Sequence, residues 1–315
     1  MWASLKQLAP GWLRALAGAG PIPKHIAFIM DGNRRFASSQ QLPRIEGHAR
    51  GYTKLTQTLE WCAQLGVTTV SVYAFSIDNF KRTQEEVDDL LTLAEAKFRE
   101  LLEQRTFIDR HKVHIRVVGD LDLLPASLRD VMCAVEAYSS QYSELTLNVC
   151  FSYTSTNEMA AACAAVAAAV RDGVLDADDV DETAVHMALA TGSDPDIIVR
   201  TSGEIRLSNF LLYQAGHAQL AFLSVLWPDL SFWDIVGVIV RFQTARLTGS
   251  LPAPPPPQLD SPLSTAPAAE RARYARLAAF RAHLADVRRT YVTSHAASHV
   301  AAASLAATSN EAATS

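Results

Sequence analysis

The stretch that decides the fold is HIAFIMDGNRRFA, residues 25–37. It begins as a short apolar run and ends abruptly in an acid, a glycine, an amide and two adjacent arginines. A turn between a strand and a helix favours Asp, Gly or Asn, but it does not need Arg34 and Arg35 as well. For one stretch alone, a turn with a solvated basic start is the simpler interpretation. Whether it is a binding site depends on the rest of the chain.

Short apolar runs rich in β-branched residues recur along the chain, separated by segments with helical periodicity. The expected strands cover residues 25–30, 67–75, 113–118, 145–151, 196–200 and 219–225. The expected helices include residues 47–65, 83–108, 125–140 and 157–170. Strands that alternate with helices predict an α/β fold with a central, mostly parallel six-stranded sheet flanked by helices. We expect this domain to occupy residues 22–246.

Both ends of the chain differ in composition from this domain. In residues 1–21, tryptophans and leucines lie among a few cations, which predicts either an amphipathic segment at a membrane interface or a helix packed on its own domain. Residues 247–268 are a proline-rich linker. Residues 269–294 predict one basic amphipathic helix, for a partner or a membrane surface. Residues 295–315 are expected to be a disordered tail.

The overall composition excludes several classes of protein. The chain has 315 residues and a net charge of −5, so it has no general basic footprint for nucleic acid, and any anion binding must be local. No apolar run reaches the roughly 20 residues of a membrane span. The four cysteines show neither CxxC nor Cys/His ligand spacing, so we expect them to be reduced and buried.

Polar side chains follow three of the expected strands at their carboxyl ends, where open α/β sheets bind ligands. Several are arginines, which would repel one another unless negative charge lay between them. Arginine forks suit phosphate oxygens, and helix N-termini after Gly32 and Gly47 would add backbone N–H groups. We therefore predict a pocket for one or two polyphosphates. Its arginines are Arg34, Arg35, Arg44, Arg82, Arg200 and Arg206.

A divalent metal would explain the acid Asp31 within this positive surrounding. Magnesium commonly takes one or two carboxylates and completes its shell with water and substrate phosphate. The alternative is a structural ion pair with Arg34 or Arg35. The chain has neither GxxxxGK[ST] nor GxGxxG after a strand, which excludes the common nucleotide-binding loops. Residues 83–108 are apolar on more than one side, and their spacing favours core packing over a cleft for a hydrocarbon chain.

Five collinear segments resemble the signature segments of the cis-prenyltransferases, the family of undecaprenyl diphosphate synthase. They are HIAFIMDGNRRFA, GHARGYTKL, YAFSIDNFKR, RVVGDLDLLP and DPDIIVRTSGEIRLSNFLLYQ with VLWPD, and they span about residues 22–245. The forms GPIPKHIAFIMDGNRRFA and RTSGEIRLSNF are most similar to the eukaryotic branch, the catalytic subunits of dehydrodolichyl diphosphate synthase. The trans-prenyltransferases use DDxxD pairs instead; here the nearest stretch, DDVDE at 178–182, is expected to be an acidic loop.

The resemblance implies a role for each matching residue. Asp31 would hold Mg²⁺ on the allylic diphosphate. Proton removal would fall to a substrate phosphate oxygen or to a water near Asn79 or His48, which makes Asp31, Asn79 and His48 the catalytic candidates. The residues around the allylic diphosphate would be Gly32, Asn33, Arg34, Arg35, Phe36, Arg44 and His48. Those beside both substrates would be Ser76, Asp78, Asn79, Phe80 and Arg82. Those on isopentenyl diphosphate would be Arg200, Arg206 and Ser208.

The implied activity is the Mg²⁺-dependent condensation of isopentenyl diphosphate onto farnesyl or geranylgeranyl diphosphate. The product would be a long-chain polyprenyl (dehydrodolichyl) diphosphate for dolichol synthesis and protein glycosylation. The alternatives are a short- or medium-chain or homodimeric cis-prenyltransferase and, less favoured, a non-catalytic scaffold subunit. Such scaffold subunits have typically lost the Asp-Gly-Asn-Arg cluster, which this chain keeps at residues 31–34.

Two departures from the bacterial members bear on the metal and on the partner. The position of a second metal-associated glutamate aligns with Gln219, and a C-terminal Arg-x-Gly element is represented only by ARLTG at 245–249. The resemblance therefore implies a heteromer with a related, Nogo-B-receptor-type partner subunit, or else a homodimer. The lipid product and the lack of an apolar span predict peripheral attachment to the cytosolic face of the endoplasmic reticulum membrane.

Overall fold

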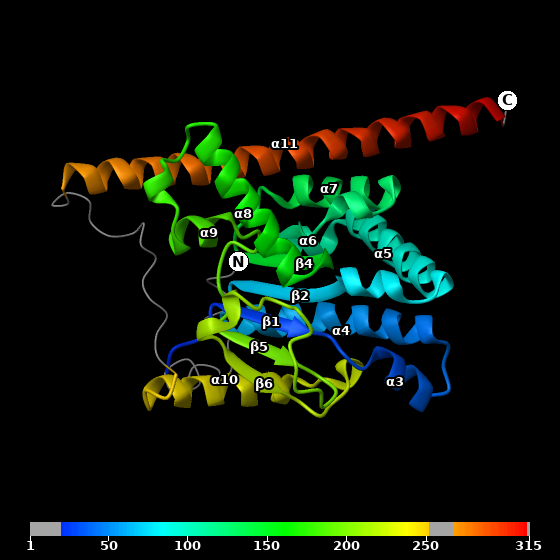
Figure 1. The fold of residues 1–315 in the computed structure, drawn as a ribbon. Coiled ribbons are helices and arrows are strands. Elements are labelled where there is room, and N and C mark those ends of the chain that lie inside the picture. Colours follow the sequence, from blue (N-terminus) through cyan, green and yellow to red (C-terminus); the bar gives the residue numbers. More distant parts are fainter. Residues whose placement is uncertain (1–19, 252–266, 314–315) are drawn as a thin grey trace.

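The central sheet has six strands, all parallel. A computed structural model of the chain describes residues 20–251 and 267–313 (Figure 1). The strands are β1 (His25–Ile29), β2 (Thr69–Ser76), β3 (Val113–Val118), β4 (Leu145–Tyr153), β5 (Ile197–Arg200) and β6 (Gln219–Phe222). Their order is β3-β4-β2-β1-β5-β6. The predicted α/β fold is confirmed.

Helices connect the strands and cover the sheet. They are α3 (Asn33–Ser39), α4 (Arg44–Leu65), α5 (Gln84–Gln104), α6 (Thr106–His111), α7 (Ala126–Ser139), α8 (Ser155–Arg171), α9 (Glu182–Ala188), α10 (Phe232–Leu247) and α11 (Ala268–Ala313). The segment predicted as one helix over 83–108 divides at Arg105, whose φ of 49° lies in the left-handed region. Most of the predicted segment 1–21 and of the linker 247–268 lies outside the described residues.

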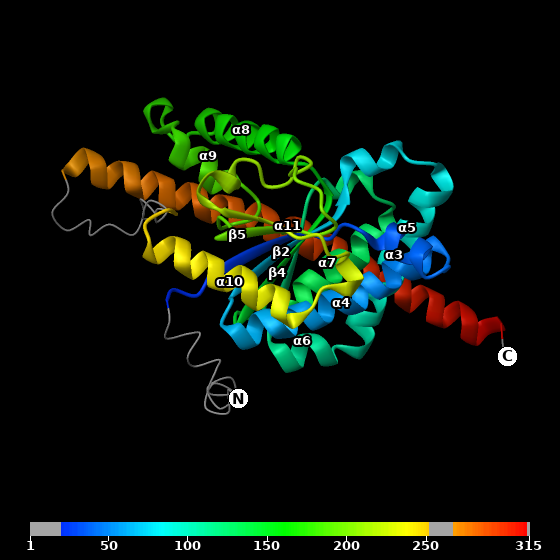
Figure 2. The same cartoon turned by 90° about the horizontal axis from the view of Figure 1, so that it is seen from below.

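The two faces of the sheet are covered differently. Side chains such as Phe28 and Val72 face the main core, which also contains apolar residues of α4, α5, α7 and α10. Side chains such as Ala27 and Ile198 face a smaller cluster formed with the segment 207–218. In Figure 2, α8 and α9 lie on the side of the sheet opposite to α4 and α10. Because all strands are parallel, their carboxyl ends lie along the same end of the sheet, and the segments that follow β1, β2 and β5 come together there.

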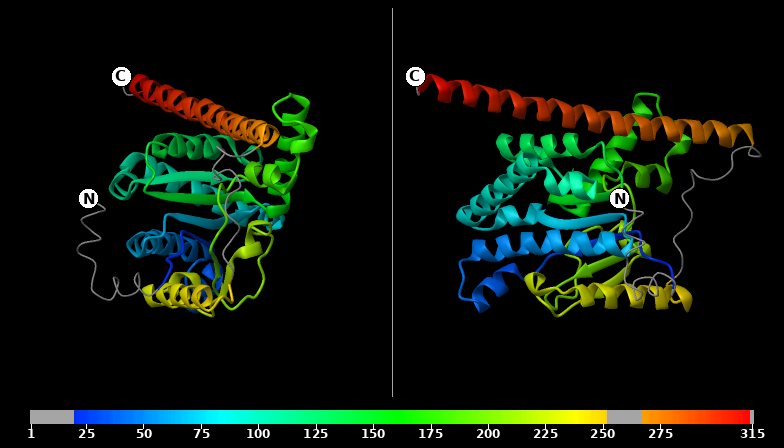
Figure 3. Two further views of the ribbon diagram at one scale, coloured as in Figure 1. Left: turned by 90° about the vertical axis from the view of Figure 1, so that its left-hand side faces the viewer. Right: turned by 180° about the vertical axis from the view of Figure 1, so that it is seen from behind.

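The C-terminal helix α11 packs along the outside of the domain, chiefly against α7 and also against α9 (Figure 3). Leu277 and Phe280 are fully buried in a small cluster with apolar residues of α8 and α9. Arg276 Nε donates to Asp179 Oδ2 at 2.6 Å, and Arg273 forms ion pairs with Asp179 and with Asp181. The acidic stretch at 176–182 and the basic helix therefore bind each other.

The middle of α11 also covers the β3 edge of the sheet. Arg288 Nε donates to Glu136 Oε1 at 2.9 Å, and Arg288 Nη2 donates to the Val117 carbonyl at 2.6 Å. Glu136 on α7 is only 5% exposed, and its Oε2 accepts a hydrogen bond from Val117 N at 2.9 Å. Because β3 is an edge strand, these bonds satisfy backbone groups that no further strand pairs.

Two expectations about this end of the chain need correction. Three arginines of the basic face, Arg273, Arg276 and Arg288, are paired within the chain, and so do not form a free basic surface. The tail expected to be disordered over 295–315 is helical as far as Ala313. The reason is its alanine content, because alanine has the highest helix propensity.

Candidate active site

Asp31 lies just past the carboxyl end of β1, where its main chain is held on two sides. The Asp31 carbonyl accepts hydrogen bonds from Thr201 Oγ1 at 2.6 Å and from Trp227 N at 3.0 Å. The next residue, Gly32, has a φ of 109°, a conformation that L side chains rarely adopt, and it turns the chain into α3. The "DG" of the opening stretch is therefore a strand-to-helix turn that fixes one carboxylate at the edge of the sheet.

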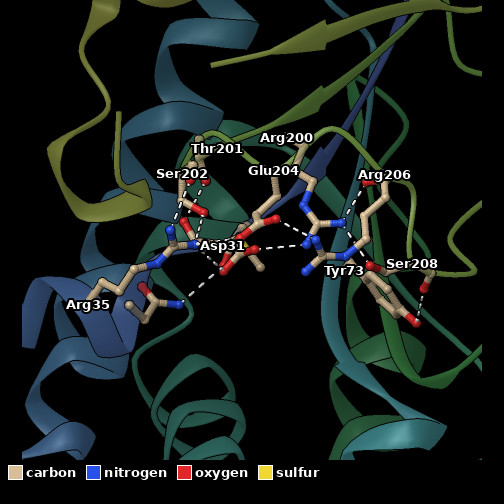
Figure 4. Close-up of polar contacts among 11 residues, drawn as sticks. Asp31, Arg35, Tyr73, Arg200, Thr201, Ser202, Glu204, Arg206 and Ser208 are labelled. Carbon is tan, nitrogen blue, oxygen red and sulfur yellow. Dashed lines mark hydrogen bonds and ion pairs between the residues drawn. The ribbon is translucent and has the colours of Figure 1, made fainter. Parts of the chain in front are cut away.

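Two arginines hold the Asp31 carboxylate (Figure 4). Arg200 Nη2 donates to Asp31 Oδ2 at 2.8 Å, and Arg35 Nη2 lies 3.5 Å from Asp31 Oδ1. Arg200 is only 4% exposed, whereas the Asp31 side chain is 31% exposed. Partial burial opposes ionisation, but the hydrogen bond and charge of Arg200 and the charge of Arg35 outweigh it, so the pKa of Asp31 is lowered from 3.8. Asp31 is an ionised, partly accessible carboxylate at neutral pH.

Arg200 also organises the loop that follows β5. Its Nη1 donates to the Arg206 carbonyl at 2.6 Å and to Ser208 Oγ at 2.8 Å. Arg35 reaches the start of the same loop, where Nη1 donates to the Ser202 carbonyl at 3.0 Å and Nη2 donates to Ser202 Oγ. The structure thus joins the ends of β1 and β5 through arginine side chains, as the sequence predicted for this edge.

A second carboxylate, Glu204, lies beside this group. Arg35 Nη2 is 3.8 Å from Glu204 Oε1, and Glu204 Oε2 forms an ion pair with Arg206 Nη1. Arg35 therefore lies within ion-pair distance of both Asp31 and Glu204. The guanidinium of Arg206 is largely exposed, whereas its carbonyl is the part that contacts Arg200.

The other three predicted arginines meet at Glu86. Arg82 Nη1 donates to Glu86 Oε1 at 2.7 Å, Arg34 Nη1 lies 3.4 Å from the same oxygen, and Arg44 Nη1 lies 4.0 Å from Oε2. The arginines thus form two groups, one around Asp31 and Glu204 and the other around Glu86. Glu86 was not predicted as a site residue, although Thr83-x-x-Glu86 has the form of a helix capping box and Glu86 follows Arg82 at i,i+4 spacing.

The three arginines Arg34, Arg44 and Arg82 together with Glu86 are called the Glu86 group. His48 and Asn33 lie between this group and the interior of the domain. Burial first, and then the charges of Arg82 and Arg34, lower the pKa of His48 to about 4, so its imidazole is neutral at pH 7. Asn33 Oδ1 is buried without a hydrogen-bond partner in the described structure. A Cβ on Gly51 would lie 2.4 Å from that oxygen, which explains the glycine at this position in α4.

The lowered pKa of His48 gives a prediction for stability. Its folded-state pKa of about 4 lies below the ordinary 6.5, so between these values the unfolded chain binds a proton that the folded chain does not. Stability from this group is complete above about pH 6.5 and declines as the pH falls towards about 4. We expect the unfolding free energy of His48→Asn to fall less than that of the wild type between about pH 7 and about pH 5 in urea denaturation. If the unfolding free energies of His48→Asn and of the wild type fell equally between these pH values, the lowered pKa of His48 would be contradicted.

The segment after β2 forms the 3-10 helix η1 (Ile77–Lys81). Asn79 Oδ1 accepts from Ser76 N at 3.0 Å, and Ser76 Oγ accepts from Asp78 N at 3.1 Å. Phe80 packs edge-on against a ring of the core. These bonds give Ser76 and Asn79 a part in shaping the turn, and a catalytic role for Asn79 stays a prediction. Phe36 lies half-buried in α3.

Gly47 and Gln219 take positions that the sequence reasoning did not expect. Helix α4 begins at Arg44, so Gly47 is not at a helix start, and a Cβ there would lie 2.3 Å from the Asn33 carbonyl oxygen. Gly47 therefore permits close packing of α4 on α3. Gln219 pairs with Ile197 at the amino end of β6, about 10 Å from the level of Arg200. Gln219 therefore does not occupy the place of a metal ligand beside Asp31.

An apolar cavity of about 160 Å³ lies beneath these polar groups, between α4, α5 and the sheet. On β4 its lining extends from Phe151 to Leu147, which is about 13 Å along the strand. The expectation of plain core packing for the inner face of residues 83–108 is therefore wrong. The lining residues from that segment are Leu90, Leu93, Ala94, Lys97, Phe98 and Leu101, and His48 and Asn33 also line the cavity.

A comparison with protein families places these features in one class. The family model described as "Putative undecaprenyl diphosphate synthase" matches residues 29–248. The chain therefore belongs to this prenyltransferase family, as its sequence resemblance implied.

Individual relatives agree with this membership. The chain is 49% identical over 227 residues to the dehydrodolichyl diphosphate synthase complex subunit of Homo sapiens, covering 71% of this chain and 68% of the relative. It is 41% identical to the geranylgeranyl-diphosphate-specific tritrans,polycis-undecaprenyl-diphosphate synthase of Pyrococcus abyssi, over 71% of this chain and 86% of the relative. The crystal structure of lavandulyl diphosphate synthase from Lavandula x intermedia, in complex with dimethylallyl diphosphate, superposes with a TM-score of 0.66 at 29% identity, covering 70% and 95% of the chains.

Proposed function

We propose that this chain is the catalytic subunit of a cis-prenyltransferase that adds isopentenyl diphosphate to farnesyl or geranylgeranyl diphosphate. The product would be a long-chain polyprenyl (dehydrodolichyl) diphosphate for dolichol synthesis. The observation that carries the proposal is an arginine-lined edge placed directly above an apolar cavity. Arginine forks suit diphosphate oxygens, and an apolar cavity suits a hydrocarbon chain. The name of the human relative, a dehydrodolichyl diphosphate synthase subunit, supports this product.

The two arginine groups suit two diphosphates. The Glu86 group, with Arg34, Arg44 and Arg82, lies beside the cavity-lining His48 and suits an allylic diphosphate whose chain enters the cavity. Arg200 and its loop suit isopentenyl diphosphate. In the reaction, the C–O bond of the allylic diphosphate breaks as the isopentenyl double bond attacks the allylic carbon, and loss of a proton leaves a cis alkene. Arginines beside the departing diphosphate stabilise its charge.

The residues around Asp31 fit a magnesium ion. Within residues 20–251 and 267–313, no three His, Cys, Asp or Glu side chains cluster as a complete metal site, so phosphate oxygens and water would have to fill the shell, as is common for Mg²⁺. Asp31 Oδ1 lies 3.5 Å from Arg35 Nη2, which is a weak contact, and the carboxylate is partly exposed. Asp31 would hold the ion, which supplies positive charge to the departing diphosphate. Neutral His48, or a substrate phosphate oxygen, would accept the proton.

We propose that the partner is a Nogo-B-receptor-type subunit bound to the face formed by α10 and β6. β6 is an edge strand of the described sheet. On α10, Trp233, Val240 and Leu247 follow one another at seven-residue spacing on one side of the helix, and Trp233 and Leu247 are each 67% exposed. Leu220 on β6 is also exposed. An exposed apolar face of this kind is typical of a protein contact. The human relative is named as a subunit of a complex.

The proposed product is a lipid, which favours a membrane location. In the part of the chain that the structure describes, no helix combines the length and hydropathy needed to cross a bilayer. We propose peripheral attachment to the cytosolic face of the endoplasmic reticulum membrane. Extraction of the protein from microsomes by high salt or alkali, without detergent, would support this placement, whereas a requirement for detergent would contradict it.

The proposed function is tested by assaying the purified chain with Mg²⁺, farnesyl diphosphate and radiolabelled isopentenyl diphosphate. The assay is run with and without the partner subunit, and products are sized by chromatography. We expect long-chain product whose yield rises when the partner is added. No incorporation in either case would contradict a catalytic role, and short products would favour a short-chain synthase. Full long-chain synthesis by the chain alone would contradict an obligatory partner.

A further inference from the structure

The loop that follows β5 contains an unusual concentration of strained backbone. Four non-glycine residues within ten positions have positive φ: Ser202 at 75°, Ser208 at 50°, Asn209 at 60° and Leu211 at 46°. Left-handed conformations of this kind persist only where surrounding contacts enforce them, and they gather at functional sites. In this loop the enforcing contacts lie at its start and at its end.

The start of the loop is held by the β6 side of the sheet. Ser202 N donates to the Val225 carbonyl at 2.7 Å, and Gly203 N donates to the Leu223 carbonyl at 2.8 Å. Arg35 adds its two bonds to Ser202. These anchors fix the first third of the loop, next to Asp31, but they do not reach Ser208.

The end of the loop is held by Asn209 at the N-terminus of α8. Ser155 N donates to the Asn209 carbonyl at 2.8 Å, and Thr156 N donates to Asn209 Oδ1 at 3.1 Å. Asn209 Nδ2 in turn donates to Thr156 Oγ1 at 2.9 Å. The first N–H groups of a helix have no partner within the helix, so they are strong anchors for an acceptor. Asn209 uses its carbonyl, its amide oxygen and its amide nitrogen in this one junction.

Ser208 lies between this anchor and Arg200. Ser208 Oγ accepts from Arg200 Nη1 at 2.8 Å, and the Ser208 carbonyl accepts from Tyr73 Oη at 3.3 Å (Figure 4). Both oxygens of Ser208 thus accept hydrogen bonds from neighbouring side chains, and the backbone position of Ser208 is fixed by the anchored Asn209, the next residue. Since the same guanidinium of Arg200 also binds Asp31, displacement of Ser208 would disturb the Arg200 geometry at the centre of the site.

We propose that Asn209 is a positioning residue for the isopentenyl diphosphate site, acting through Ser208 and Arg200. This inference rests on the proposed function. Asparagine suits the position because it tolerates the left-handed conformation and carries both a donor and an acceptor. Alanine would lose both amide bonds and would be strained at a φ of 60°. Aspartate would keep the acceptor for Thr156 N, and it also tolerates this conformation.

The test compares Asn209→Ala, Asn209→Gly and Asn209→Asp in full-length protein with its partner. We expect Asn209→Ala to raise the KM for isopentenyl diphosphate about tenfold, with less than about a twofold change in the KM for the allylic substrate. Glycine removes the strain but restores neither bond, so it should remain defective, whereas aspartate should recover most of the loss. Asn157→Ala is the matched control and should behave as wild type, because Asn157 lies in the same first turn of α8 and its backbone N–H, which the substitution keeps, donates to Thr154 Oγ1.

Two results would overturn the inference. One is an equal loss for both substrates in Asn209→Ala, with a matching fall in melting temperature, because that indicates general destabilisation. The other is full recovery by glycine, because that indicates strain alone. Calorimetric binding of isopentenyl diphosphate, without an allylic substrate, should also weaken about tenfold in Asn209→Ala. If the wild type binds this ligand but shows no turnover, the proposed function fails while the inference on Asn209 can still be judged.

Discussion

Replacement of Asp31 by asparagine is expected to lower turnover about 10³-fold, equivalent to about 4 kcal/mol, while leaving the fold intact. Asparagine preserves the shape of the side chain, and its Oδ1 can still accept from Arg200 or Arg35. It removes the one negative charge that lies between those arginines and that would ligate Mg²⁺. The loss should therefore fall on kcat, since the charge is needed as the diphosphate departs.

The measurement is the initial rate of radiolabelled isopentenyl incorporation at saturating substrates, together with thermal unfolding followed by circular dichroism. Asp172→Asn is the matched control. Asp172 is an exposed acid that pairs with the adjacent Arg171 at the end of α8, and it does not belong to the candidate site. It should show wild-type turnover. If Asp31→Asn showed undiminished turnover and products of normal length, Asp31 would have no part in the chemistry.

Replacement of Arg288 by alanine is expected to destabilise the domain by about 3 kcal/mol and to lower its melting temperature by about 5 °C. The substitution leaves the Glu136 carboxylate buried beside β3 with only the Val117 N–H as its backbone donor, and it also leaves the Val117 carbonyl without its Arg288 bond. Breaking a buried ion pair from one side is costly because the remaining charge is desolvated. Partial exposure of Arg288 places the effect at the lower end of the usual range.

The next residue provides the control for this prediction. Arg289 is exposed and pairs with Asp286 one turn away, so Arg289→Ala should change stability by less than about 0.5 kcal/mol. Both variants are measured by urea denaturation of the same full-length protein. Equal stabilities of Arg288→Ala and Arg289→Ala would contradict a structural role for the junction of α11 with β3.

The strands were predictable from the sequence because parallel, doubly covered strands are continuous apolar runs bounded by turn residues. The stretch at 25–30 and the run at 196–200 illustrate this, since both lie close to β1 and β5. Helix α10 was not predicted, because the turn at Pro228 and the apolar run after it resemble a further buried strand as much as a helix. The helix α9 was not predicted either, because the acidic residues before it were assigned to a loop.

The arginines of the site were predictable from the sequence, but their arrangement was not. The arginines after each strand could be assigned to one edge, but their division between Asp31 and Glu86 depends on side-chain reach, which spacing does not encode. The cavity was not predicted for a related reason. Apolar residues such as Phe98 and Leu101 give the same sequence pattern whether they face a packed core or a cavity. Asn209 was not singled out, because only the backbone conformation of the loop makes its role visible.

The two outer strands of the sheet differ in what lies against them. At β3, Arg288 of α11 occupies backbone groups that another strand would need, whereas β6 at the opposite edge carries no such cover among the described residues. A chain with one blocked edge and one available edge can join a neighbour in a single direction. Any association through the sheet edge would therefore have to use β6, because the C-terminal helix closes the β3 edge to a further strand.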